Sequence, residues 1–270
     1  MKIAAITDEI SKDLAYALDV IKREEIQYID LRGVWGGNVV DLSDAQVAEA
    51  QQLIAAHGLT VTAISTPVGK SQITADFAPE RARFQRALEL AQHFGASYIR
   101  VFSFYATPAE AIEYREEALA RIRQLCEMAQ PYGVILAHEN EEGGFCAWRP
   151  EECLAFHQAL PANFGALFEP CSFTVMGYDP YTDALPLLLP YTVYVHVRDT
   201  ARATTHYGVV GEGDVRWLDI LAELKRQQFS GYLTLEPHLG WQNYAALTDE
   251  TRTANFQRAT AALRTALAKI

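Results

Sequence analysis

The stretch Val134-Ile-Leu-Ala-His-Glu139 is a short apolar run that ends on an acidic side chain, and loop-like sequence follows it. The same pattern occurs three more times, in Phe164-Gly-Ala-Leu-Phe-Glu169, Thr192-Val-Tyr-Val-His196 and Tyr232-Leu-Thr-Leu-Glu236. Runs of this length and composition predict buried β-strands. Side chains at the ends of four successive strands converge on one point only if the strands run parallel in one sheet or barrel. The pattern therefore predicts a parallel arrangement.

The four side chains that end these runs are three carboxylates and one imidazole: Glu139, Glu169, His196 and Glu236. This oxygen-rich set suits Mn²⁺, Mg²⁺ or Co²⁺ better than a metal that seeks thiolates, and Zn²⁺ remains an option. A single glutamate after a strand is more often a helix cap or a solvated loop residue than a ligand. Because four successive strands end in ligand-type residues, we expect one divalent metal ion at the mouth of a barrel.

Length and composition restrict the class of protein. A chain of 270 residues suits one (β/α)₈ barrel, although two smaller domains would also fit. Half of the residues are hydrophobic and 21% are charged, which predicts a globular chain with a large core. The formal charge of −11, without a visible basic stripe, argues against nucleic acid and anionic membranes as partners. We expect a small-molecule ligand, and whether the chain forms a homo-oligomer stays open.

Cysteine usage and the beginning of the chain indicate a compartment. The four cysteines form no CxxC pair and no secretory signal precedes them, so reduced thiols and a cytoplasmic protein are expected. The segment Met1-Lys-Ile-Ala-Ala-Ile-Thr7 begins directly as a strand. No apolar run approaches the ~18 residues of a membrane span, so neither targeting nor membrane insertion is expected.

A strand-like run followed by a helix-like run recurs along the whole chain, and no long linker separates domains. The expected strands cover residues 3–7, 28–31, 59–65, 98–102, 134–138, 164–168, 192–197 and 231–235. The expected helices cover residues 11–24, 43–57, 79–94, 108–132, 150–160, 181–189, 215–228 and 248–268. Ser11 and Ser43 are suited to begin two of these helices, and Gly58, Gly95 and Gly133 to end three of them.

Eight such units predict one domain, residues 1–270, folded as a closed (β/α)₈ barrel of the α/β class. The main alternative is a doubly wound open sheet, whose usual sign is a glycine-rich phosphate-binding turn after the first strand. The corresponding turn here is Asp8-Glu-Ile10, which contains no glycine. In a (β/α)₈ barrel the carboxyl ends of the strands face the active site, so residues there are the candidates for catalysis.

Five segments are similar, in order and spacing, to the sugar phosphate isomerase/epimerase family with a xylose isomerase-like barrel. They are His138-Glu-Asn140, Phe168-Glu-Pro-Cys-Ser-Phe173, His196-Val-Arg-Asp199, Gly211-Glu-Gly-Asp-Val215 and Leu235-Glu-Pro-His238. The resemblance runs along the whole chain and implies that the four strand-end residues bind one divalent metal ion. The chain departs from the family at Glu169, where aspartate is more usual. It also has Ser172 and Phe145 where epimerases of free ketoses often carry a histidine and a carboxylate.

The residue types predict the chemistry. To move a carbonyl along a sugar, or to invert the carbon beside it, an enzyme removes a weakly acidic C–H proton and stabilises the resulting enediolate. A metal ion bound to the carbonyl and hydroxyl oxygens supplies that stabilisation. Glu139 and Glu236 would approach from opposite sides, so one can remove a proton while the other returns it, although a role as ligands alone stays open. We expect a metal-dependent isomerase or epimerase of a small keto-sugar or polyol ketone.

Three other functions are alternatives to a metal-dependent isomerase or epimerase. A dehydratase of a cyclic polyhydroxy ketone would use the same metal and base but expel a β-hydroxyl group. An endonuclease of the apurinic-site type would need several zinc ions, more histidines than the seven present and a basic groove. A barrel that binds sugar without turning it over is disfavoured because both Glu139 and Glu236 are present.

Three residues near His196 are candidates for contacts at the site. Arg202 follows His196 by six residues, the offset at which family members often place an arginine near the substrate. Asp199 could orient the imidazole, and Arg198 precedes it. For these residues a solvated loop position or a surface ion pair is the alternative.

Further candidates for substrate binding lie in other loops at the same end of the barrel. His238 follows Glu236 by two residues and is therefore expected on the same face. Lys70 and Arg32 could contact an anionic group, and Trp35 could form an aromatic wall of the site. A position facing water, or ordinary loop packing, is the alternative for each of them.

Overall fold

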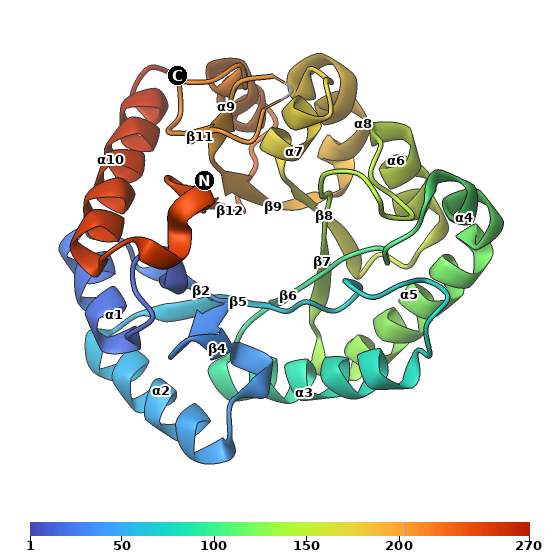
Figure 1. Cartoon of the computed structure of the whole chain (residues 1–270), viewed down its shortest axis with the longest axis horizontal. Helices are drawn as coiled ribbons and strands as arrows, with labels where there is room; N and C mark the ends of the chain where they lie inside the picture. Colours follow the sequence, from blue (N-terminus) through green and yellow to red (C-terminus); the bar gives the residue numbers. More distant parts are fainter. Residues whose placement is uncertain (203) are drawn as a thin grey trace.

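The computed structural model describes residues 1–202 and 204–270, and its centre is a closed barrel of parallel strands (Figure 1). The strands follow the order β1-β12-β9-β8-β7-β6-β5-β2 around the barrel. Their bounds are β1 Lys2–Ile6, β2 Tyr28–Leu31, β5 Thr60–Ser65, β6 Tyr98–Val101, β7 Ile135–Glu139, β8 Phe164–Phe168, β9 Thr192–Val197 and β12 Tyr232–Leu235. The barrel closes where β1 pairs with β12, with Ala5 opposite Leu235. The predicted (β/α)₈ barrel is confirmed.

Helices surround the barrel (Figure 1). The main ones are α1 Leu14–Arg23, α2 Asp44–His57, α3 Ala78–Phe94, α5 Arg115–Ala129, α6 Pro150–Ala159, α9 Trp217–Arg226 and α10 Asp249–Leu267. Ser43 begins α2 as predicted, because its hydroxyl accepts from the Gln46 N–H, and Gly58 ends it with a φ of 69°. The prediction for Ser11 is wrong, since Asp13 caps α1 and the Ser11 hydroxyl accepts from the Asp13 N–H.

Two predicted helices are interrupted. The helix expected over residues 108–132 consists of α4 Pro108–Glu113, a break at Tyr114, α5, and a 3₁₀ turn η3 Gln130–Tyr132. The helix expected over residues 181–189 consists of a π-turn η4 Pro180–Ala184, α8 Leu185–Leu188 and a 3₁₀ turn η5 Leu189–Tyr191. A further short helix, α7 Pro170–Val175, begins directly after Glu169 and was not predicted. At six residues it is too short to show a helical period.

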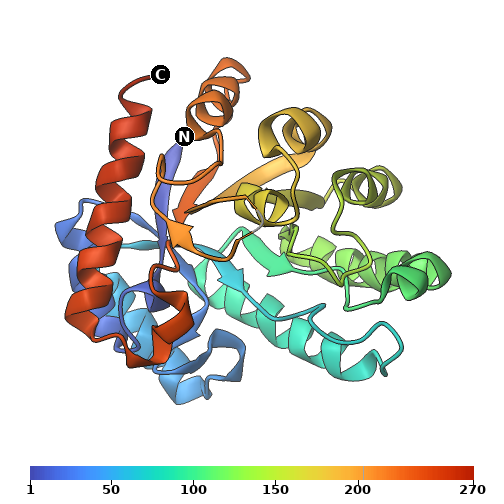
Figure 2. The ribbon, with the colours of Figure 1, turned by 45° about the horizontal axis from the view of Figure 1, so that its top comes forward.

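Two small hairpins extend the carboxyl end of the barrel. The first pairs β3 Gly33–Val34 with β4 Gly37–Asn38, and the second pairs β10 Asp199–Thr200 with β11 Tyr207–Gly208. A Cβ atom at Gly33 would lie 2.7 Å from Cγ of Asp8, so only glycine allows the first hairpin to pack on the loop after β1. Figure 2 shows both chain termini at the opposite end of the barrel from these loops.

The interior of the barrel changes character along its axis. At the amino end the rings of Tyr28, Tyr98, Tyr194 and Tyr232 pack against one another, with centroids 5.2 to 6.1 Å apart. The Tyr194 hydroxyl lies 2.6 Å from Oγ1 of Thr62, so its polar atom is satisfied. Towards the carboxyl end, buried charged side chains replace the aromatic ones. Aromatic side chains therefore fill the amino end of the barrel, and charged side chains occupy the carboxyl end, where the loops meet.

Outside the barrel, the strands and helices bury one large apolar cluster. Trp217 is its largest fully buried member, and its indole N–H donates to the Arg198 carbonyl at 2.9 Å. This bond ties α9 to the end of β9. Among the described residues, no helix combines the length and the apolar character that crossing a membrane requires.

Candidate active site

The structure brings the four strand-end residues together at the carboxyl end of the barrel. Glu139 ends β7, Glu169 follows β8, His196 lies in β9 and Glu236 follows β12. Each offers a ligand atom within 4.8 Å of the others, and each side chain is buried. The predicted convergence is thus observed, while their role as metal ligands stays a prediction.

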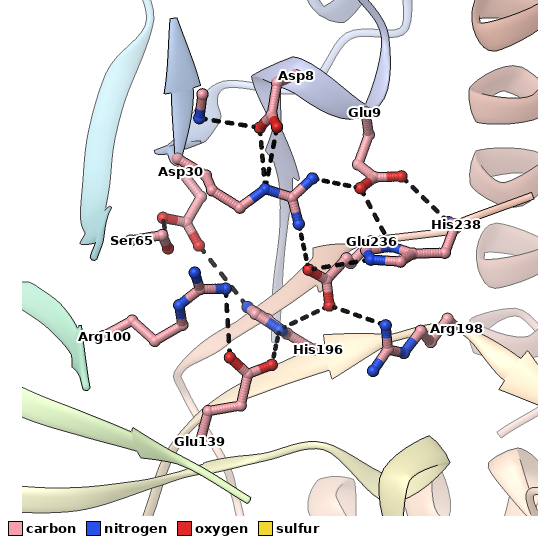
Figure 3. Close-up of polar contacts among 12 residues, drawn as sticks. Asp8, Glu9, Asp30, Ser65, Arg100, Glu139, His196, Arg198, Glu236 and His238 are labelled. Carbon is pink, nitrogen blue, oxygen red and sulfur yellow. Dashed lines mark hydrogen bonds and ion pairs between the residues drawn. The ribbon is translucent and has the colours of Figure 1, made fainter. Parts of the chain in front are cut away.

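His196 lies between Glu139 and Glu236 (Figure 3). Its Nδ1 atom is 3.0 Å from Oε1 of Glu139 and 3.1 Å from Oε2 of Glu236. Its Nε2 atom lies 3.8 Å from Oδ2 of Asp30, whose other oxygen accepts from the Ser65 hydroxyl at 2.8 Å. Nδ1 therefore faces the carboxylates, and Asp30 in β2 lies on the opposite side of the imidazole.

Asp199 does not occupy the position that we predicted. Its carboxylate accepts from the backbone N–H groups of Thr200 at 2.9 Å, Gly211 at 2.8 Å and Val215 at 3.2 Å. These bonds fold the loop after β9 around the buried carboxylate. The expectation that Asp199 orients the imidazole is wrong, because Asp199 lies in the β10–β11 hairpin and Asp30 is beside His196 instead.

Glu169 has two roles in the local structure. Its Oε1 atom accepts from the N–H groups of Cys171 at 2.7 Å and Ser172 at 3.3 Å, and so caps α7. Its Oε2 atom has no hydrogen-bond partner among the described residues and lies 3.4 Å from Nε of Arg198. The side chain of Asn140 donates to the Glu169 carbonyl and accepts from its N–H, which fixes the end of β8 against β7.

Two buried arginines and the partly buried Arg32 balance the carboxylates. Nη1 of Arg100 lies 3.2 Å from Oε2 of Glu139, and Nη1 of Arg198 lies 3.7 Å from Oε2 of Glu236. Nη1 of Arg32 is 2.5 Å from the other oxygen of Glu236. Sequence reasoning missed Arg100, although a charged residue inside the apolar run Tyr98-Ile-Arg-Val101 was a usable signal, since a buried charge requires a partner.

The charges shift the ionisation of the group. Burial alone would raise the pKa of Glu139, but Arg100 and His196 outweigh it and lower that pKa to about 2. Burial raises the pKa of Glu169 to about 8, with Arg198 opposing the shift. Burial would lower the pKa of His196, yet Glu236 and Glu139 raise it well above its usual value. The negative potential at Nδ1 is therefore strong enough to hold a positive charge there.

The donor set fits a divalent metal ion. Glu139, Glu169 and Glu236 each have a buried Oε2 atom without a hydrogen-bond partner among the described residues. Buried oxygens are normally satisfied, so such atoms require an explanation. A divalent cation bound by these oxygens and Nδ1 of His196 would satisfy them, and the binding would release the imidazole proton.

A cavity of about 320 Å³ opens above this group. It is lined by Asp8, Arg32, Lys70, Arg100, Glu139, Glu141, Glu142, Arg198, Tyr207, Glu236, His238, Trp241 and Tyr244. Of the predicted substrate contacts, Arg32, Lys70, Arg198 and His238 therefore line the cavity. Nζ of Lys70 pairs with Oε2 of Glu141 at 2.6 Å, and the His238 ring stacks on Trp241 with centroids 4.2 Å apart.

Besides Asp199, two predicted substrate contacts are not among the described residues that line the cavity. Arg202 is exposed, and its backbone N–H donates to Asp214 at 2.7 Å in the loop after β10. Trp35 has a φ of 51° in the β3–β4 turn and packs, half-buried, against the apolar cluster outside the barrel. The structure corrects both expectations, because Arg202 is exposed in the loop after β10 and Trp35 packs against the apolar cluster outside the barrel.

Comparison with known proteins identifies the family. A family model described as "Xylose isomerase-like TIM barrel" matches residues 18–265. The chain belongs to this family. Among curated proteins, no sequence matches. The predicted resemblance is therefore confirmed at the level of the xylose isomerase-like family.

Solved structures share the fold of this xylose isomerase-like barrel. The IOLI protein with a binding zinc atom is 18% identical, with a TM-score of 0.79 and coverage of 100% of this chain and 99% of that one. An L-ribulose 3-epimerase is 18% identical, with a TM-score of 0.76 and coverage of 100% and 95%. The probable 3-DHS dehydratase AsbF, involved in petrobactin synthesis from Bacillus anthracis, is 17% identical, with a TM-score of 0.75 and coverage of 95% and 98%.

Two sequence departures within this xylose isomerase-like barrel have structural counterparts. Phe145 is buried and stacks on Phe102 with centroids 5.8 Å apart. Ser172 is fully buried in α7, and its hydroxyl has no hydrogen-bond partner among the described residues. Neither residue is among the described residues that line the cavity.

Proposed function

We propose that the protein is a divalent-metal-dependent isomerase or epimerase of a small keto-sugar or polyol ketone. The observation that carries this proposal is the position of two carboxylates on either side of one imidazole nitrogen. Glu139 and Glu236 lie 3.0 and 3.1 Å from Nδ1 of His196, come from strands separated by β8 and β9, and both line the cavity. Two carboxylates in this arrangement suit proton removal and return at adjacent carbons.

Despite burial, neighbouring cations lower the pKa of both glutamates and keep them ionised, the form that can accept a proton. When bound, the divalent ion would act as a Lewis acid that acidifies the C–H group next to a substrate carbonyl. Arg100 keeps Glu139 ionised, so this carboxylate can accept a proton from carbon. Glu236, held by Arg32 and Arg198, can return a proton from another side or exchange roles with Glu139. Buried charges around the developing enediolate would also strengthen electrostatic stabilisation.

The cavity wall supports a small polar substrate. Charged and hydroxyl groups occupy most of the wall and offer hydrogen bonds to sugar hydroxyls. Tyr207, whose hydroxyl donates to Glu142 at 3.1 Å, and Trp241 provide aromatic surfaces on which sugar C–H groups can stack. An epimerase and a zinc-containing protein among the fold neighbours are compatible with this proposal.

Isotope exchange provides the test. The protein is purified, its metal content is measured, and a panel of ketoses and cyclic ketones is incubated with it in D₂O. We expect NMR to show deuterium at the carbon beside the carbonyl for at least one substrate, and exchange to stop when the metal is removed. Exchange that persists in the double variant Glu139→Gln/Glu236→Gln would overturn the proposed roles of the two glutamates.

A dehydratase of a cyclic polyhydroxy ketone is the second candidate. The observation that favours it is the Lys70–Glu141 pair on the cavity wall, with Nζ and Oε2 2.6 Å apart. This pair could give a proton to a departing β-hydroxyl group after Glu139 or Glu236 has removed the C–H proton. One fold neighbour is a probable dehydratase. Ultraviolet absorbance of a conjugated enone product, lost in Lys70→Met, would distinguish this reaction from isomerisation.

A further inference from the structure

A second group of ligand-type side chains adjoins the proposed metal site. Glu9, Glu236 and His238 each offer a ligand atom within 4.8 Å of the others, and all three side chains are buried (Figure 3). Glu9 ends the 3₁₀ turn η1 Thr7–Glu9 after β1, while Glu236 and His238 follow β12, the strand that pairs with β1. Glu236 belongs to both groups, so the two potential cation positions share one carboxylate.

The guanidinium of Arg32 lies in this second group. Its Nη2 atom is 2.5 Å from Oε1 of Glu9, and its Nη1 atom is 2.5 Å from Oε1 of Glu236. Its Nε atom donates to both oxygens of Asp8 at 3.1 Å. The planar guanidinium thus bridges carboxylates from the ends of β1 and β12, a geometry that lysine cannot reproduce.

His238 completes the group. Its Nδ1 atom lies 3.1 Å from Oε1 of Glu9, yet it makes no hydrogen bond to any described residue, and the side chain is 7% exposed. Two carboxylates and an imidazole nitrogen with no hydrogen-bond partner form a set that suits Mn²⁺ or Zn²⁺. The guanidinium of Arg32 is the cation in contact with both carboxylates of this set.

We propose that Arg32 takes the place of a second divalent cation and thereby limits the site to one metal ion. Its positive charge neutralises Glu9 and Glu236, which would otherwise be two buried carboxylates with too little positive charge beside them. Because Arg32 binds Oε1 of Glu236, Oε2 of that residue faces Nδ1 of His196. Arg32 is therefore also a positioning residue for the proposed metal ligand and base.

Metal stoichiometry tests this inference. Metal-free wild type and Arg32→Ala are titrated with Mn²⁺ by calorimetry, and bound metal is counted by elemental analysis. We expect Arg32→Ala to bind one more ion per chain than wild type. Since both ions would share Glu236, electron paramagnetic resonance should show magnetic coupling between them that wild type lacks. Adding Glu9→Gln to Arg32→Ala should remove the extra ion, whereas Glu9→Gln alone should leave the wild-type stoichiometry unchanged.

Control variants separate the proposed role from general effects. Arg32→Lys keeps a cation and should gain no ion, and Arg216→Ala removes a surface arginine paired with Asp179 and Asp219 and should gain none either. If Arg32→Ala does not fold without metal, Mn²⁺ should restore its folding. Arg32→Gln, which also removes the positive charge, is the second variant for the same titration.

The outcomes also separate this inference from the proposed function. Equal ion numbers in Arg32→Ala and wild type, an extra ion that persists without Glu9, or failure of Mn²⁺ to restore folding would each overturn the inference. A wild type that binds no ion would refute the metal site of the proposed function instead. In that case the difference between Arg32→Ala and wild type would still decide the role of Arg32.

Discussion

Glu139 and Glu236 divide their oxygens between different partners. Each has one oxygen near Nδ1 of His196, and each lies beside a buried arginine, Arg100 for Glu139 and Arg198 for Glu236. In Glu139→Gln and in Glu236→Gln we expect kcat to fall by about 10²–10⁴-fold, because an amide cannot act as a general base. Rates at saturating metal with the substrate identified by isotope exchange provide the measurement. Glu89→Gln, on the surface of α3, serves as the control. A single variant with more than about a tenth of the wild-type kcat would show that its glutamate is not the base.

Glu169 allows a separation of metal binding from helix capping. Without metal, burial raises its pKa to about 8, so the neutral amide of Glu169→Gln resembles the protonated side chain and can still cap α7. We expect both Glu169→Gln and Glu169→Ala to bind Mn²⁺ at least about tenfold more weakly. Loss of a metal ligand, or of a residue that supports one, typically weakens metal binding by this much. Only Glu169→Ala should also lose about 1 kcal/mol of metal-free stability, since it removes the cap. Calorimetry and urea unfolding measure the two effects.

Unchanged Mn²⁺ affinity in both variants would leave Glu169 with its capping role alone. The comparison with Glu169→Asp adds a further check, because aspartate is the residue expected at this position from the family resemblance. A shorter carboxylate that still binds the ion should give an affinity between those of wild type and Glu169→Ala.

At the scale of elements, the strands were easier to predict than the helices. Each barrel strand is a short apolar run that is buried on both faces, so its composition identifies it. Helix interruptions depend on single residues in context. Tyr114 has φ −99° and ψ 15° between α4 and α5, although nothing in its residue type requires a break there. The segment over residues 180–191 contains three prolines at the starts of short turns, which divide what periodicity alone presents as one helix.

The candidate site was predictable only in part, for a related reason. Ligand-type residues at strand ends can be recognised one strand at a time, so Glu139, Glu169, His196 and Glu236 were predictable. The roles of Asp30, Arg100 and Glu9 depend on partners on other strands, and strand order and register are needed before those partners are known. Asp199 was assigned wrongly because sequence spacing does not show that the chain turns into a hairpin after β9.

Helix α6 contains a titratable group that should make stability depend on pH. His157 is buried against His138, Phe164 and Tyr191, and burial lowers its pKa to about 4. Below about pH 6.5 the unfolded chain binds a proton that the folded chain does not bind until about pH 4. The contribution of His157 to stability should therefore fall as the pH decreases from 7, by on the order of 2 kcal/mol at pH 5, while Glu169, whose pKa burial raises to about 8, acts in the opposite direction.

Urea unfolding at pH 7 and pH 5 tests this expectation. The variant His157→Gln should be less stable than wild type at pH 7, because it loses ring packing, and this deficit should shrink by on the order of 2 kcal/mol at pH 5. His138, whose pKa burial lowers to about 3, remains in both proteins, so the difference between them isolates His157. An identical pH dependence in wild type and variant would contradict the expected proton uptake.

For the whole molecule, closure of the barrel joins the two ends of the sequence at the site. Arg32 and Glu236 are 204 positions apart, and the Tyr244 hydroxyl donates to the Asp8 carbonyl across 236 positions at 2.9 Å. The proposed metal ligands come from β7, β8, β9 and β12, so they link a further part of the barrel to the same point. A ligand that binds there therefore requires the neighbouring strands β7, β8, β9 and β12 to be assembled.

Metal binding should consequently stabilise the molecule as one unit. An ion that binds only the folded state at 100 times its Kd adds about 2.7 kcal/mol to the free energy of unfolding. For a domain of this size that corresponds to an increase in Tm of about 5–10 °C. Calorimetry of metal-free protein with and without Mn²⁺ should show a single transition that moves upward as a whole. The shift should be smaller in Glu236→Gln and preserved in Arg216→Ala, whose side chain pairs with Asp179 and Asp219 on the surface. Two separate transitions, of which only one moves with Mn²⁺, would show that the barrel does not unfold cooperatively and that the site depends on only part of it.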